Sequence, residues 1–210
     1  RLEDKMKLIN LAIALAYDAK VNIRDVYYQV RMWDTIIYNF LKDKGIVVPP
    51  AKRSSKSEKY EGAYVKEPKP GRYNWVVNFD LNSLYPHLIM QYNISPETLL
   101  DRRHPTVTVD RLLQKQDEID GKYCVAPNGA QYRKDIHGFL PEIMQKIYNE
   151  RVQSKKLMIM AKQEYEKTPT KKLEKDISKY NNIQMARKIQ LNSAYGAIGN
   201  QYFRYYNLRN

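Results

Sequence analysis

Two segments near the start of the chain carry apolar residues at helical spacing. The first stripe consists of Leu8, Leu11, Ala12, Leu15 and Ala16. The second consists of Trp33, Ile36, Ile37, Phe40 and Leu41. This periodicity predicts two amphipathic helices that pack against a core, and Gly45 with the pair Pro49-Pro50 is expected to end the second helix.

A strand is predicted over residues 75–80, where β-branched and aromatic residues alternate. One face would carry Trp75, Val77 and Phe79, and the other Val76, Asn78 and Asp80. Because Asn82 and Ser83 can cap a helix, we expect a buried strand that ends in the Asp80 carboxylate and turns directly into a short helix. Such a carboxylate, beside helix N–H groups, can hold a metal ion next to a phosphate; the alternative is an Asp that only caps the helix.

A helical hairpin is predicted over residues 141–198. Pro141 suits a first helical turn, and helical character continues to Lys167. Thr168-Pro169-Thr170 interrupts it, with Thr168 as the expected cap and Pro169 as the expected first residue of a second helix that ends near residue 198. The connection is so short that the two helices are expected to pack antiparallel.

The pattern is weakest over residues 93–139. Ser95-Pro96 and Asn128-Gly129 indicate turns, and residues 107–109 predict a short strand. The acidic cluster at residues 117–120 (Asp117, Glu118 and Asp120) lacks a neighbouring hydrophobic strand, so it is interpreted as solvated surface rather than as a metal site. His87, His104 and His137 have no partner at ligand spacing, which argues against a zinc site.

The charge of the chain points to a polyanionic partner. Lys and Arg number 36 against 23 Asp and Glu, a net charge of +13, and nucleic acid is the commonest partner for such an excess. Eighteen tyrosines add flat surface that can stack on bases or fill half-buried positions. The single Cys124 excludes a disulfide within the chain, and without a signal peptide or a long apolar run no membrane partner is expected.

Three polar residues share one face of the second hairpin helix. Lys188, Asn192 and Tyr195 are spaced by four and seven residues, so they project in the same direction. An ammonium, an amide and an aromatic ring in one row suit a phosphate, a sugar edge and a base plane. The alternative is an ordinary solvated helix face.

The hairpin is also expected to bring two cations together. Arg151 lies 17 residues before Thr168, and Lys188 lies 18 residues after Thr170. In an antiparallel pair these offsets place both at the same level, where they could clamp a triphosphate.

Two stretches resemble motifs of family B DNA polymerases. Asp80-Leu81-Asn82-Ser83-Leu84-Tyr85-Pro86 is similar to the D-x-x-S-L-Y-P signature, motif A. Lys188-Ile189-Gln190-Leu191-Asn192-Ser193-Ala194-Tyr195-Gly196 is similar to K-x-x-x-N-S-x-Y-G, motif B. Tyr60-Glu61-Gly62-Ala63 resembles the Y-x-G-G/A segment that joins exonuclease and polymerase domains and touches template DNA. Residues 93–98 and 197–210 are most similar to the replicative polymerases of T-even-type bacteriophages.

The resemblance implies a template-directed DNA polymerase, which transfers a nucleotide from dNTP to a primer 3′-hydroxyl with two Mg²⁺ ions. The implied catalytic residues are Asp80 and Lys188, and the implied metal ligands are Asp80 and Leu81. The implied nucleotide-binding residues are Leu81, Ser83, Leu84, Tyr85, Arg151, Lys155, Lys188, Asn192 and Tyr195. The implied DNA-binding residues are Tyr60, Gly62, Tyr195 and Gly196. Tyr85 is implied to lie under the sugar, where it would exclude a 2′-hydroxyl.

Motif C of the family, a Y-G-D-T-D-S segment with the second catalytic carboxylate, has no counterpart, since no Asp-x-Asp occurs in the sequence. We therefore expect a fragment that is inactive alone and needs a polypeptide segment supplying motif C and the thumb. The implied partners are primer–template DNA, dNTP and, through parts outside this sequence, a sliding clamp. The implied location is the cytoplasm of an infected bacterial host. The alternatives are a non-catalytic DNA-binding or assembly subunit of a split or degenerate polymerase, and an unrelated basic helical RNA-binding protein.

The expected fold is α+β and mostly helical: part of a polymerase palm (a short sheet plus helices) with a long antiparallel helical hairpin as fingers. Residues 1–59 are expected to form a helical segment and linker that follow the exonuclease domain. Residues 60–139 would form the palm portion with motif A, residues 140–198 the fingers hairpin with motif B, and residues 199–210 the return to the palm.

Overall fold

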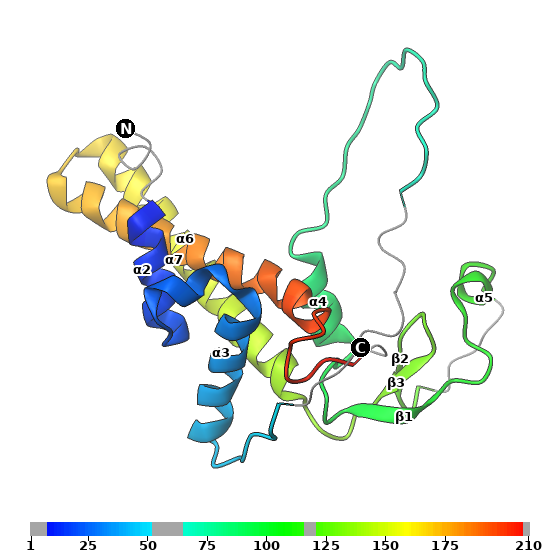
Figure 1. The fold of residues 1–210 in the computed structure, drawn as a ribbon. Helices are drawn as coiled ribbons and strands as arrows, with labels where there is room; N and C mark the ends of the chain where they lie inside the picture. Colours follow the sequence, from blue (N-terminus) through cyan, green and yellow to red (C-terminus); the bar gives the residue numbers. More distant parts are fainter. Residues whose placement is uncertain (1–7, 52–64, 116–120, 208–210) are drawn as a thin grey trace.

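A computed structural model describes residues 8–51, 65–115 and 121–207 (Figure 1). The helices are α2 (Leu8–Ala19), η1 (Ile23–Tyr27, a 3₁₀ turn), α3 (Gln29–Asp43), α4 (Leu84–Gln91), α5 (Val109–Leu113), α6 (Phe139–Lys167) and α7 (Lys171–Ile198). The strands are β1 (Leu99–Arg103), β2 (Cys124–Val125) and β3 (Ala130–Tyr132). The α+β, mostly helical fold expected from the sequence is confirmed. The predicted linker at residues 52–59 lies outside the described residues.

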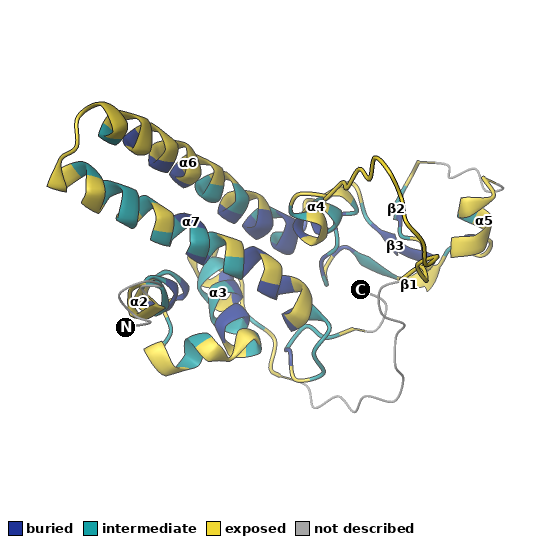
Figure 2. Ribbon diagram, turned by 90° about the horizontal axis from the view of Figure 1, so that it is seen from above, coloured by how far each residue is buried: buried dark blue, intermediate teal, exposed yellow. Residues whose placement is uncertain are grey.

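The long hairpin of α6 and α7 is the framework of the molecule. At 1.5 Å per residue, α6 is a rod of about 43 Å. Buried residues gather in its basal half, where α2, α3 and α4 pack, whereas the tip is exposed (Figure 2). Among the described residues, no helix combines the length and the apolar character needed to cross a membrane.

The helix boundaries at the hairpin tip differ from the prediction by a few residues. Thr168 ends α6, with its N–H donating to the Glu164 carbonyl, and α7 begins at Lys171. Thr170 is therefore the cap instead of Thr168, because its hydroxyl accepts a hydrogen bond from the Leu173 N–H at 3.2 Å.

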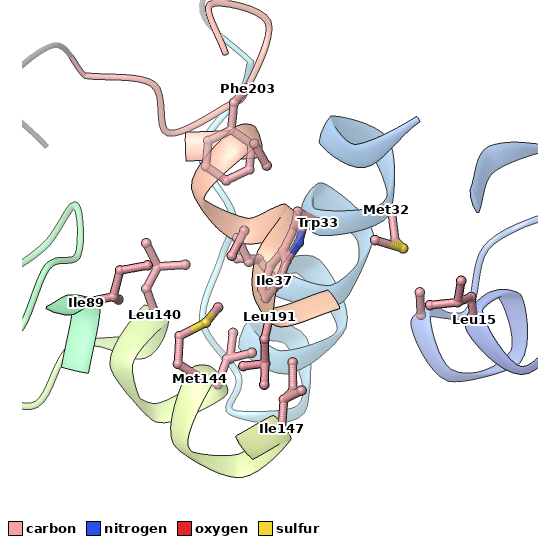
Figure 3. Packing of buried hydrophobic residues seen from close by; sticks show 14 of the residues in the cluster. Leu15, Met32, Trp33, Ile37, Ile89, Leu140, Met144, Ile147, Leu191 and Phe203 are labelled. Carbon is pink, nitrogen blue, oxygen red and sulfur yellow. The ribbon is translucent and has the colours of Figure 1, made fainter. Parts of the chain in front are cut away.

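One apolar core joins the two predicted N-terminal helices to the base of the hairpin (Figure 3). Its buried members are Leu15, Ala19, Met32, Trp33, Ile37, Leu41, Ile89, Leu140, Ile143, Met144, Ile147, Ala186, Leu191, Ala194, Ala197 and Phe203. Trp33 is 1% exposed, and its indole N–H donates to the Ser193 Oγ at 2.9 Å, which satisfies the only polar atom of this side chain. The core therefore locks α3 to the motif B segment of α7.

A small antiparallel sheet in the order β1-β3-β2 forms a second lobe with α5, away from α2 (Figure 1). The predicted turn at Asn128-Gly129 joins β2 to β3, with Gly129 at φ +81°. The prediction of a short strand at residues 107–109 is wrong. Thr108 accepts a hydrogen bond from the Arg111 N–H, so the chain begins α5 there.

Residues 93–98 connect this lobe to the hairpin by capping α6. The Ser95 Oγ and the Glu97 carboxylate accept hydrogen bonds from the N–H groups of Leu140 and Phe139, at 3.3 and 2.6 Å. Asn93 accepts from the Gly138 N–H at 2.9 Å and donates to two carbonyls of the connecting loop. These side chains satisfy N–H groups that an α-helix leaves without a partner at its start.

The strand predicted over residues 75–80 does not form. The segment is an open loop that extends away from the helices (Figure 1), and Trp75 and Phe79 are 98% and 90% exposed. A strand needs a neighbour for its hydrogen bonds and a surface to cover its apolar face, and the described residues supply neither. The alternating pattern is present, but no strand pairs with it within residues 8–51, 65–115 and 121–207.

We expect Trp33→Ala to lower the free energy of unfolding by about 3–5 kcal/mol, because it opens a cavity at the core and leaves Ser193 without its donor. Urea unfolding followed by circular dichroism measures this change. Tyr17→Ala is the control: Tyr17 is 86% exposed, and its removal should change stability by no more than about 0.5 kcal/mol. Equal effects of the two substitutions would contradict the assignment of the core.

Candidate active site

Residues from three distant segments line one groove of about 660 Å³. The motif A segment contributes residues 79–85, α6 contributes Arg151, and α7 contributes Lys188 and Asn192. The fold thus brings together most of the residues implied by the two motifs, including Asp80, Leu81, Ser83, Leu84 and Tyr85.

Ser83 shapes the floor of the groove. It adopts a left-handed conformation, with φ +54° and ψ 43°, just before α4 begins. The expected side-chain cap is absent; instead, the Ser83 Oγ accepts a hydrogen bond from the Arg151 Nη1 at 3.0 Å. The first helical hydrogen bond is His87 N–H to the Ser83 carbonyl at 3.2 Å, so the N–H groups of Leu84 and Tyr85 precede the hydrogen-bond ladder of the helix. They are available to an anion, which the positive end of a helix favours.

The two predicted cations meet at this groove. Arg151 on α6 and Lys188 on α7 both line it, as their matching distances from the hairpin tip predict. The Nε of Arg151 is buried and has no hydrogen-bond partner among the described residues. A guanidinium and an ammonium facing the start of α4 together create a site for a negatively charged group such as a phosphate.

An aromatic pair borders the cations. Tyr85 of α4 stacks on Tyr195 of α7, with ring centroids 4.2 Å apart and an angle of 14° between the ring planes. Both rings remain about two-fifths exposed. The pair therefore offers flat surface next to Arg151 and Lys188, which is an arrangement that suits a sugar and a base.

Lys155 lies beside the groove rather than in its wall. It lines an adjoining hollow of about 340 Å³ along α6, with Lys156 and several apolar side chains. Asn82 and Arg151 line both spaces, so the two are neighbours.

The remaining implied DNA-binding residues fall elsewhere. Gly196 faces the first residue of α3: a Cβ at this position would lie 2.8 Å from the Gln29 Oε1, the end of a flexible side chain that would have to move aside. Gly196 also lines a hollow of about 590 Å³ whose rim includes the exposed rings of Tyr27, Tyr28 and Tyr202. Tyr60 and Gly62 lie outside the described residues.

Asp80 is the carboxylate of the groove. Asp80 and Leu81 both line the groove, and a carboxylate and a backbone carbonyl are hard oxygen donors of the kind that Mg²⁺ prefers. Within residues 8–51, 65–115 and 121–207, no group of three or more His, Cys, Asp or Glu side chains is placed to hold a metal ion. The acidic cluster of Asp117, Glu118 and Asp120 is not among the described residues. The donor set fits a shared metal site, to which bound phosphates and a further carboxylate would contribute.

Sequence reasoning missed two features that build this site. The hydrogen bond between Arg151 and Ser83 joins residues 68 positions apart and has no local signal. The capping of α6 by Ser95 and Glu97 was also missed, although a polar run with a proline directly before a helical segment could have suggested it. The first fixes how α6 meets the motif A segment, and the second fixes how the start of α6 meets residues 93–98.

Backbone N–H groups at a helix start, two cations lining one groove and a stacked aromatic pair are groups whose chemistry suits a phosphorylated, base-containing ligand. The family comparison is specific about the class: the chain belongs to DNA polymerase family B, whose model matches residues 26–209.

Three relatives illustrate the similarity. The DNA-directed DNA polymerase of Escherichia phage RB69 is 33% identical over 251 residues, and that of Enterobacteria phage T4 is 31% identical over 249. These alignments take in 100% and 99% of this chain but only 28% of each phage protein. The structure also resembles the family B DNA polymerase of the archaeon Pyrobaculum calidifontis, with a TM-score of 0.67 and 26% identity over 99% of this chain and 24% of that one. The chain therefore spans about a quarter of the relatives that it matches.

The stacked tyrosines should be energetically coupled. In a double-mutant cycle of Tyr85→Ala and Tyr195→Ala, we expect a coupling of about 0.5–1.5 kcal/mol in the free energy of unfolding, the usual range for a stacked pair. A matched cycle of Tyr85→Ala with Tyr202→Ala should give no coupling, since Tyr202 is exposed and lines a different hollow. Zero coupling in the first cycle would show that the rings do not stack in solution.

Proposed function

We propose that this chain is the nucleotide-binding portion of a template-directed DNA polymerase, which transfers a nucleotide from dNTP to the 3′-hydroxyl of a primer. The observation that carries the proposal is the single groove in which motif A, Arg151 and motif B meet. Membership of DNA polymerase family B agrees with this function. The α6–α7 hairpin would act as the fingers, and residues 60–139 as part of the palm.

Each side of the groove has a role in holding dNTP. Arg151 and Lys188 bind the triphosphate, and the N–H groups of Leu84 and Tyr85 bind its oxygens from the other side. The Tyr85 ring lies under the sugar, and Asn192 and Tyr195 border the nascent base pair. Lys155, in the adjoining hollow, makes a secondary contact to the phosphates.

Asp80 and the Leu81 carbonyl would hold Mg²⁺. When bound, two such ions stabilise the attacking and leaving oxygens of phosphoryl transfer. The residues of this chain bind and orient the triphosphate, while the second carboxylate has to come from elsewhere, because the sequence contains no Asp-x-Asp. We therefore propose that the 210 residues do not extend primers alone.

The open segment at residues 75–81 suggests where the missing part docks. Trp75, Val76, Val77, Phe79 and Leu81 are all more than two-thirds exposed. An alternating apolar segment becomes a stable strand when another strand pairs with it. A partner segment with motif C and the thumb would pair here, cover these side chains and place its carboxylates beside Asp80.

The net charge of +13 supports binding to primer–template DNA. Because two of the relatives are phage polymerases, the site of action would be an infected bacterial host. A sliding clamp would be bound through other parts of the polymerase.

The competing function is a non-catalytic DNA-binding or assembly subunit. It is favoured by one observation: of the described residues that line the groove, Asp80 alone carries a carboxylate. The two functions differ in whether the groove supports nucleotide transfer once a motif C segment is present.

A chimera tests this difference. The 210 residues replace the aligned segment of the Escherichia phage RB69 polymerase, and primer extension is measured with Mg²⁺ and dNTP. We expect extension by the chimera, and a loss on the order of 10³-fold in Asp80→Ala, because one carboxylate is central to metal binding. DNA affinity and its salt dependence should stay unchanged in this variant, since Asp80 makes no favourable contact with phosphates.

A folded chimera that binds DNA but extends no primer would favour the non-catalytic subunit. Asp110→Ala is the control, because Asp110 lies on α5 in the other lobe and should not affect extension.

Tyr85→Ala in the same chimera should admit ribonucleotides. Without the ring, a 2′-hydroxyl no longer meets a steric barrier, so the preference for dNTP over rNTP should fall at least about tenfold, or about 1.4 kcal/mol. Competing incorporation of dATP and ATP measures this preference. An unchanged ratio would show that Tyr85 does not select the sugar.

A further inference from the structure

We propose that Arg187 is a positioning residue for the triphosphate site: by bridging Glu150 of α6 and Asp18 of α2, it fixes the level at which Arg151 and Lys188 meet. This inference rests on the proposed function, because it assigns a purpose to the alignment of those two cations. Neither motif includes Arg187, and nothing in its local sequence distinguishes it from the other basic residues of the hairpin.

The Arg187 guanidinium holds three helices together. Its Nη2 lies 2.6 Å from the Glu150 Oε2, and its Nη1 donates to the Asp18 Oδ2 and, at 3.1 Å, to the Gln190 Oε1. Gln190 in turn donates to the same Asp18 oxygen at 2.6 Å and is fully buried. The charged side chains are only 16–34% exposed, so this is a partly buried cluster rather than a surface ion pair.

The cluster adjoins both cations of the groove along the chain, although its charged residues line a different hollow. Glu150 directly precedes Arg151 on α6, and Arg187 directly precedes Lys188 on α7. Each cation of the groove therefore follows one member of the Glu150–Arg187 ion pair. Successive helical residues point about 100° apart, so α6 and α7 can pair through Glu150 and Arg187 while the next residues face the groove. A bond between these two helices therefore fixes how far one can slide along the other at the level of Arg151 and Lys188.

The cluster is also tied to the core. The Ser193 Oγ donates to the Gln190 carbonyl and accepts from the Trp33 indole, both at 2.9 Å. These bonds connect Asp18 of α2, through Gln190 and Ser193, to Trp33 of α3. The register of the hairpin is thus held against a packed surface instead of by a lone pair of side chains.

Arginine suits this place because its planar fork reaches two carboxylates at once. Burial raises the pKa of the Glu150 carboxyl, and the ammonium of nearby Lys146 acts against that shift. A lysine at position 187 would keep the charge but could not bridge both partners with the same geometry. The conservative substitution therefore tests geometry separately from charge.

The experiment measures the affinity of the 210-residue chain for dATP and dAMP with Mg²⁺, by displacement of a fluorescent dATP analogue. We expect the parent chain to prefer dATP, and Lys188→Gln to reduce that preference. Glu150→Gln and Arg187→Gln should weaken dATP binding about tenfold and dAMP binding less than about twofold, with Arg187→Lys in between. General loosening of the fold would weaken both ligands alike, so the ratio of the two affinities reports positioning.

Glu142→Gln is the matched control. It removes a different ion pair of α6, to Lys44 after α3, on a side that does not line the groove, and should leave the ratio unchanged. All variants are compared at a temperature at which their helical circular dichroism equals that of the parent; if Arg187→Gln does not fold, Glu150→Gln and Arg187→Lys decide the question.

Two results would count against the account in different ways. If Lys188→Gln changes the ratio but Glu150→Gln and Arg187→Lys do not, Arg187 has no positioning role and the proposed function stands. If the parent chain shows no preference for dATP over dAMP, the groove is not a triphosphate site, and both the proposed function and the role of Arg187 fall.

Discussion

The packing of α7 is the constraint on which the site depends. One face of this helix is buried against α2, α3 and α6, and includes Gln190, Leu191, Ala194 and Ala197. The other presents Lys188 and Asn192 to the groove. Small residues on the buried face allow close approach of the neighbouring helices, so α7 has little freedom to rotate or slide. Because the buried face fixes the rotation of α7 about its axis, it also fixes the direction in which Lys188 and Asn192 point.

The sequence predicted the longer helices, because the spacing of apolar residues within a helix shows which of its faces is buried. The helices α2, α3, α6 and α7 were all expected from the sequence. The two N-terminal helices followed from apolar residues at helical spacing, and the hairpin followed from a long helical segment that Thr168-Pro169-Thr170 interrupts. The strand at residues 75–80 could not be settled in this way. Its alternation is clear, but a strand is stable only with a partner, and the described residues provide none.

The candidate site shows the same division. The residues of motifs A and B were identified from the sequence, and the matching offsets of Arg151 and Lys188 from the tip predicted that they would share a groove. The prediction that the Ser83 side chain caps α4 was wrong, because its hydroxyl oxygen accepts a hydrogen bond from the Arg151 guanidinium and none from a helix N–H group. Contacts such as that from Asp18 to Arg187, 169 residues apart, depend on tertiary packing and leave no pattern in the sequence.

The central claim is that the groove between motif A and the hairpin holds the triphosphate of an incoming dNTP. A crystal structure of this chain with dATP and Mg²⁺ tests it most directly. The account predicts triphosphate density between Arg151 and Lys188, against the start of α4, with the sugar over the Tyr85 ring. Density for the nucleotide at another surface, with this groove empty at saturating dATP, would contradict it.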